Sequence, residues 1–96
     1  MVNLREKPYY LSDEDMKWVE DTIASMTDEE KIGQLFVNMV TSRKPEDLKN
    51  AVKNYHVGAI RYHNAPPEEL YEQNRILQEN SKIPLIIACN TENGGN

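Results

Sequence analysis

The feature that most constrains the fold is an apolar, branched run near the carboxyl end of the sequence, residues 83–89 (IPLIIAC). Such a run is typical of a parallel strand that is buried on both faces. The segment after it, residues 90–96 (NTENGGN), is polar and glycine-bearing, which is typical of a loop. In open α/β sheets and α/β barrels, ligands bind in the loops that follow the carboxyl ends of strands. We therefore expect the chain to end within a binding site and to be the front piece of a larger enzyme.

Two amino-terminal helices are expected within residues 12–35, after a leader of residues 1–11. Ser12 and Thr27 each precede a group of acidic residues, which is typical of a helix N-terminal cap. Apolar residues then recur at helical spacing, which predicts a buried stripe on the first helix and an apolar face on the short second one. These residues are Met16, Val19, Ile23 and Met26 in the first helix and Ile32, Leu35 and Phe36 in the second.

Strands are predicted to alternate with helices after residue 35. The strand candidates are residues 36–40, 59–62 and 83–89. Pro45 and Pro67 each suit the first turn of an intervening helix, and Gly58 is expected to end the first of these helices as a left-handed cap. Strands that alternate with helices pair in parallel through right-handed crossovers. The chain is thus expected to be one α/β fragment, in which residues 36–96 form β/α units that end in a site loop.

Composition and charge argue against several classes of partner. The net charge is -5 and the basic residues are scattered, which argues against a nucleic-acid or anionic-membrane surface. No apolar stretch approaches the roughly 20 residues that cross a bilayer, and residues 1–11 lack the apolar core of a signal peptide. The single cysteine, Cys89, cannot form an internal disulfide. A cytoplasmic location is therefore expected.

Neither a metal site nor a cofactor is expected. His56, His63 and Cys89 match no common spacing of metal ligands. Four aromatic side chains offer a possible sugar-stacking platform, but their positions favour core packing. These are Trp18, Tyr55, Tyr62 and Tyr71.

Three segments together resemble the amino-terminal domain of family 3 glycoside hydrolases, nearest to the β-N-acetylglucosaminidase branch. They are residues 26–36 (MTDEEKIGQLF), 57–60 (VGAI), and 83–88 (IPLIIA) with 90–95 (NTENGG). The resemblance implies a (β/α)8 barrel of which this chain holds the first strands and helices, since such a barrel typically needs about 250 residues. It also implies a retaining O-glycosyl hydrolase that acts on terminal β-linked N-acetylglucosamine or glucose through a glycosyl-enzyme intermediate.

The same resemblance implies substrate-binding roles for the loop after the third strand. Asn90 falls where the family commonly has an Asp that holds sugar hydroxyls, and an Asn side chain lacks the charge of that carboxylate. Glu92 matches the following acidic position, and Gly94 and Gly95 match a glycine pair that lets the backbone turn under the substrate. The family's nucleophile and acid/base lie beyond Asn96, so no catalytic residue is expected here and the chain alone is expected to be inactive.

Two other classes stay open. A stand-alone α/β binding or signalling module would favour acidic residues after the first strand or a glycine-rich turn between a strand and a helix, and the sequence offers neither. An assembly piece would act through exposed sheet edges, and a partial barrel has such edges, so self-association is expected. The uncovered inner face is expected to carry Val37, Met39, Ile60, Ile86 and Ala88, or the residues that alternate with them.

Overall fold

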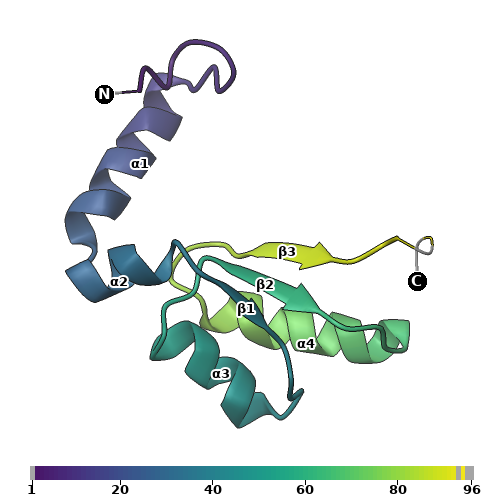
Figure 1. Cartoon of the computed structure of the whole chain (residues 1–96). Helices are drawn as coiled ribbons and strands as arrows, with labels where there is room; N and C mark the ends of the chain where they lie inside the picture. Colours follow the sequence, from purple (N-terminus) through teal and green to yellow (C-terminus); the bar gives the residue numbers. More distant parts are fainter. Residues whose placement is uncertain (1, 93, 95–96) are drawn as a thin grey trace.

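The computed structural model describes residues 2–92 and 94, in which helices and strands alternate as predicted (Figure 1). The elements are α1 (Asp13–Ser25), α2 (Asp28–Gly33), β1 (Val37–Met39), α3 (Pro45–Lys53), β2 (Ala59–Tyr62), α4 (Pro67–Asn80) and β3 (Ile86–Cys89). The strands form one parallel sheet in the order β1-β2-β3. This is the α/β arrangement of a partial barrel, with two helices ahead of the β/α units. None of the described helices combines the length and apolar character needed to span a membrane.

Helix starts lie where the sequence predicts them. The Ser12 hydroxyl accepts a hydrogen bond from the N–H of Asp15, whose carboxylate accepts one from the N–H of Ser12. Thr27 and Glu30 form the same reciprocal pair at the start of α2. Pro67 is the first residue of α4. Each capping box satisfies backbone N–H groups that the first turn of a helix leaves without partners.

The hydrophobic core lies between the sheet and the layer formed by α3 and α4 (Figure 1). Its buried residues are Val40, Leu48, Val52, Val57, Ile60, Ile76, Leu77 and Leu85. Register places Ile60 beside Asn38 and Ile87, so these three share the sheet face that the helices cover. The prediction that Ile60 lies on the inner face with Val37 is therefore wrong, because Ala59 is the partner of Val37 and takes that place.

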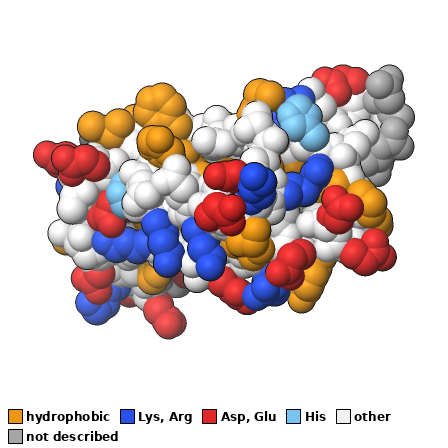
Figure 2. Space-filling view, turned by 90° about the horizontal axis from the view of Figure 1, so that it is seen from below, with side chains coloured by type: hydrophobic (Ala, Val, Ile, Leu, Met, Phe, Trp, Pro, Cys, Tyr) orange, Lys and Arg blue, Asp and Glu red, His pale blue; other side chains and the backbone are white. Residues whose placement is uncertain are grey.

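The other face of the sheet is open. By register it carries Val37, Met39, Ala59, Arg61, Ile86 and Ala88. Val37 is 61% exposed and Ile86 is 70% exposed. The outer side of the helix layer differs, because acidic and basic side chains are interspersed over it (Figure 2). The open face is thus an apolar surface that the described residues leave uncovered.

Helix α1 projects away from the sheet and contains no buried residue (Figure 1). The predicted buried stripe is therefore wrong for this chain, since Ile23 is 52% exposed. The apolar residues at and after α2 are also exposed, Leu35 most of all at 83%.

The core-packing prediction is wrong as well for Trp18, Tyr55 and Tyr71, which are exposed because no described element packs over them. Tyr62 is half-buried.

Gly58 has a different role from the predicted helix cap. Helix α3 ends at Lys53, and the left-handed conformation nearby belongs to His56, with φ of 54°. A Cβ atom on Gly58 would overlap the carbonyl oxygen of Gln34, and one on Gly33 would overlap the carbonyl oxygens of Tyr55 and His56. The N–H of Gly58 donates to the carbonyl of Gly33 at 3.2 Å. The two glycines therefore allow two main-chain segments to cross in direct contact.

Candidate carbohydrate-binding edge of the sheet

The carboxyl ends of the three strands lie at one edge of the sheet, because all pairings are parallel (Figure 1). The loops that leave this edge are residues 40–44 after β1, residues 63–66 after β2, and the segment after β3. Asn90 and Glu92, two of the predicted site residues, lie in the last of these loops. This edge is the place where parallel α/β sheets bind ligands.

Asn90 is held by an arginine from the neighbouring strand. The Nε atom of Arg61 in β2 donates a hydrogen bond to Oδ1 of Asn90 at 2.8 Å. Arg61 is half-buried on the open face of the sheet, where its register partners are Met39 and Ala88. The sequence interpretation missed Arg61. A usable signal exists, since a charged residue inside the short strand AIRY is unusual for a buried parallel strand.

A second arginine connects two loops at the same edge. The Nη2 atom of Arg43, which follows β1, donates to the backbone carbonyls of His63 and Asn64, each at 3.3 Å. Its Nη1 atom lies 3.9 Å from a carboxylate oxygen of Glu69 in the first turn of α4. Arg43 therefore holds the loop after β1 against the loop after β2. The sequence interpretation missed this residue too, because long-range contacts of a loop arginine leave no local pattern.

The remaining predicted site residues lie further along the loop. Glu92 is exposed, and among the described residues it forms no ion pair. Gly94 has φ of 103°, a conformation that favours glycine, and its N–H donates to the carbonyl of Thr91 at 3.1 Å. Gly95 lies outside the described residues. The structure therefore brings Asn90 together with Arg61 and leaves Glu92 apart from both.

The side chains described at this edge are suited to binding a ligand. Arg61 and Asn90 supply hydrogen-bond donors, and Glu92 is the one carboxylate among the described residues of the three loops. Retaining glycoside hydrolysis uses two carboxyl groups about 5 Å apart. Within the described part of the chain, no group of three or more His, Cys, Asp or Glu residues is placed to hold a metal ion. His56 and His63 lie at opposite edges of the sheet, before and after β2.

Tyr62 and Cys89 are cross-strand partners near the ends of β2 and β3. Register places them on the sheet face that carries Ile60, the face covered by helices. The Cys89 side chain raises the pKa of Tyr62 above its ordinary value of 10.0. Cys89 is a half-buried free thiol. Both side chains therefore lie on the helix-covered face of the sheet, at the carboxyl ends of their strands.

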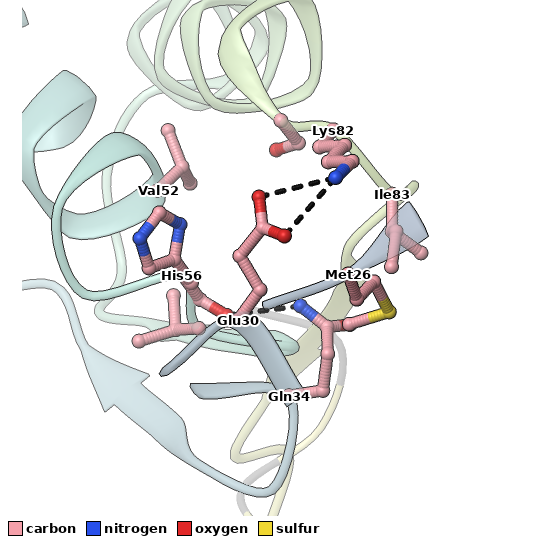
Figure 3. Close-up of a pocket in the computed structure, with 9 residues that line it drawn as sticks. Met26, Glu30, Gln34, Val52, His56, Lys82 and Ile83 are labelled. Carbon is pink, nitrogen blue, oxygen red and sulfur yellow. Dashed lines mark hydrogen bonds and ion pairs between the residues drawn. The ribbon is translucent and has the colours of Figure 1, made fainter. Parts of the chain in front are cut away.

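A small pocket lies at the opposite, amino edge of the sheet (Figure 3). Its lining residues precede the strands, and Glu30 from α2 reaches Lys82 there, with 3.0 Å between Oε2 and Nζ. The backbone N–H of Thr27 and the ammonium of Lys82 lower the pKa of Glu30. Gln34 donates to the carbonyl of His56 at 2.9 Å. The pocket has a volume of about 20 Å³, room for one water molecule, so it is not a ligand site. It marks the joint, the contact through which α2 is held to the segment before β3.

The comparisons with known proteins agree with this geometry. No family model matches the chain. A protein named β-N-acetylglucosaminidase/β-glucosidase from Cellulomonas fimi is 32% identical over 94 residues, which are 98% of this chain and 17% of that protein. The solved structure of a β-glucoside phosphorylase, BglX bound to 2FGlc, is 41% identical and superposes with a TM-score of 0.83 over 97% of this chain. Both matches support the resemblance of this chain to the amino-terminal part of family 3 glycoside hydrolases.

The chain spans 17% of the length of each of these two relatives. The predicted resemblance is confirmed, and so is the partial barrel, because the fold of this short segment matches part of a much larger solved chain. The carboxyl edge that carries Asn90 is the working edge of an α/β barrel, whereas the joint around Glu30 is at the edge that serves stability.

Proposed function

We propose that this chain supplies the first β/α units of the barrel of a retaining O-glycosyl hydrolase. Its substrates would carry terminal β-linked N-acetylglucosamine or glucose. The observation that supports this most is the match over 97% of the chain to a β-glucoside phosphorylase at 41% identity and a TM-score of 0.83. The relative from Cellulomonas fimi, named for both sugars, supports the same substrate class. These matches favour the proposal over a stand-alone binding or signalling module.

In this proposal the loop after β3 contacts the sugar. Asn90, held by Arg61, would hydrogen-bond to sugar hydroxyls, because its amide donates as well as accepts. Glu92 is an exposed acceptor, and Gly94 turns the backbone, with Gly95 assigned to the same turn by resemblance alone. The nucleophile and the acid/base come from other parts of the enzyme. The 96-residue chain by itself is therefore proposed to be inactive, and the reaction needs no cofactor.

A second candidate is phosphorolysis, in which phosphate takes the place of water as acceptor. The specific observation in its favour is the name of the solved relative, a β-glucoside phosphorylase. Both candidates use the same edge of the sheet and differ in the acceptor. The products separate them, because hydrolysis releases the free sugar and phosphorolysis releases a sugar phosphate.

The proposal also covers the location of the enzyme and the self-association of the isolated chain. We place the enzyme in the cytoplasm, where a free thiol such as Cys89 stays reduced. We also propose that the isolated chain self-associates through its open sheet face, because exposed apolar patches of this kind usually mark interfaces.

Activity assays on the isolated chain and on a longer enzyme that contains it test the proposal. We expect no turnover of aryl β-N-acetylglucosaminide or aryl β-glucoside by the chain alone and clear turnover by the longer enzyme. In the longer enzyme Asn90→Ala should lower kcat/KM, whereas Asn50→Ala on α3, away from the edge, should not. The proposal fails if the repurified chain alone turns over substrate and loses that activity on Glu92→Gln.

A further inference from the structure

Arg61 carries a charge on the open face of the sheet without a carboxylate partner among the described residues. The ion pairs of the described chain involve other basic residues, and Arg61 is in none of them. Its register partners, Met39 and Ala88, are apolar. A half-buried guanidinium between apolar neighbours needs hydrogen-bond acceptors or a counter-charge to offset its loss of hydration.

The single hydrogen bond of the Arg61 side chain in the described structure uses its Nε and the Oδ1 of Asn90. This bond uses one of the two lone pairs of the Asn90 oxygen. The donors that remain are the two terminal amino groups of Arg61 and the Nδ2 amino group of Asn90. The pair therefore presents mainly donors and carries a charge of +1. An Asp at position 90 would have made the pair neutral and would have presented acceptor oxygens instead.

We propose that Arg61 and Asn90 bind a phosphate group at the carboxyl edge of the sheet. This inference rests on the proposed function, since it takes that edge to be the substrate edge. A planar guanidinium binds oxyanions through two parallel N–H donors. Phosphate has oxygens directed to several sides, so it accepts from Arg61 and from Nδ2 of Asn90 at once. A planar carboxylate would accept hydrogen bonds from the guanidinium of Arg61 but not from Nδ2 of Asn90 at the same time.

The phosphate group has two possible sources, inorganic phosphate and a phosphorylated sugar. Both present the same oxyanion to Arg61 and Asn90. Glu92, the carboxylate in the loop after β3, forms no ion pair with Arg61, so the charge of Arg61 stays available to a ligand.

The test is an NMR titration of the isotope-labelled chain at pH 7 and constant ionic strength. The three probes are inorganic phosphate, glucose 6-phosphate and glucose. We expect the Arg61 Nε–H and Asn90 Nδ2 signals to shift and saturate with a phosphate probe, and glucose to have a much smaller effect. Tighter binding of inorganic phosphate would identify the free ion as ligand, and tighter binding of glucose 6-phosphate would identify a phosphorylated sugar.

Asn90→Asp is the decisive variant, because it replaces one amide by a carboxylate of the same shape. We expect it to weaken phosphate binding about tenfold, which corresponds to about 1.4 kcal/mol. Lys49→Gln, on α3, changes the net charge by the same amount and should leave binding unchanged. Asn90→Ala tests the donor role in a second way and should also weaken binding.

Three results would overturn the proposal: no saturable shift with either phosphate probe, an equal response to glucose, or unchanged phosphate affinity in both Asn90 variants. Signal dispersion in each variant spectrum verifies that the chain is folded. The binding experiment is independent of glycoside turnover. A failure here therefore leaves the proposed enzyme standing, and a failure of the activity assay leaves phosphate binding measurable.

Discussion

The two faces of the sheet are built from similar side chains and have opposite surroundings. On the helix side Ile60 and Leu77 are fully buried, whereas on the open side Val37 and Ile86 are mostly exposed. Both crossovers, through α3 and through α4, return on the same side of the sheet (Figure 1). Right-handed crossovers between successive parallel strands produce that result. The handedness of the connections, more than the hydrophobicity of each residue, therefore decides which face this chain buries.

Truncating one residue on each side tests the comparison most directly. Leu77→Ala should lower the free energy of unfolding by about 2–5 kcal/mol, because it leaves a cavity in a closed core. Ile86→Ala removes a side chain of similar size from the open face and should change stability far less. Chemical denaturation followed by circular dichroism measures both. Equal losses would mean that the open face is covered in solution.

Self-association is the way in which the open face would become covered. We expect light scattering to give a mass above that of one chain, and Ile86→Lys to lower it by placing a charge on the apolar patch. Lys53→Glu, at the end of α3, is a control that changes charge away from this face. A monomer at all concentrations in the unaltered chain would contradict the prediction.

Gly58→Ala tests whether the close main-chain contact at the amino edge of the sheet can open. The added methyl group would overlap the Gln34 carbonyl, so we expect a loss of about 1–3 kcal/mol, as in overpacked sites. Gly94→Ala is a comparison variant that places no atom near the added methyl group but strains the backbone at φ of 103°, so a loss there comes from backbone conformation and not from overlap. Similar denaturation midpoints for Gly58→Ala and the unaltered chain would show that the crossing can open.

Thr27→Ala removes the cap of α2, which leads into the edge strand of the sheet. We expect a loss of about 0.5–2 kcal/mol, because the Glu30 N–H loses its side-chain acceptor. Thr41→Ala, at an exposed loop position, should have little effect. An unchanged denaturation midpoint for Thr27→Ala would mean that α2 contributes nothing to the stability of the fold that the sheet forms with α3 and α4.

The smallest expected effect is a dependence on pH from Glu30. Its folded-state pKa is lowered from the ordinary 4.5 by the Thr27 N–H and by Lys82. Its stabilisation is therefore present above pH 4.5 and is lost as pH falls through the lower, folded-state pKa. Glu30→Gln should flatten the acid limb of a stability–pH curve, whereas Glu29→Gln should not. Identical curves for both variants would exclude the Glu30–Lys82 pair as the source.

Local signals predicted the elements well because capping boxes and proline starts act within a few residues. Ser12, Thr27 and Pro67 all begin helices as expected. The orientation of Ile60 was predicted wrongly, since Ala59 and Ile60 are both apolar and only the register with Val37 distinguishes their faces. Gly58 was assigned to a cap for a similar reason, because its close contact is with Gln34, far away in sequence.

The candidate site was predicted in part. The family resemblance pointed to Asn90, but Arg61 and Arg43 become visible only when the strands are placed side by side. The exposure of Trp18, Ile23 and Tyr71 also lay beyond local reasoning. Helical spacing identifies an apolar side, and it does not tell whether another element within the same chain packs against that side.

The contact between Gly33 and Gly58 has a consequence for how sequences of this type can diverge. The crossing is made of main chain, with the Gly58 N–H on the Gly33 carbonyl, and Glu30 of α2 adds to it through its ion pair with Lys82. The exposed side chains of α2 therefore do not determine the direction in which that helix leaves the sheet. Exposed positions such as Ile32 and Leu35 are therefore free to change without turning α2, while positions 33 and 58 admit glycine alone. Natural variation should accordingly be concentrated at the exposed positions of α2 and just after it, and be nearly absent at Gly33 and Gly58.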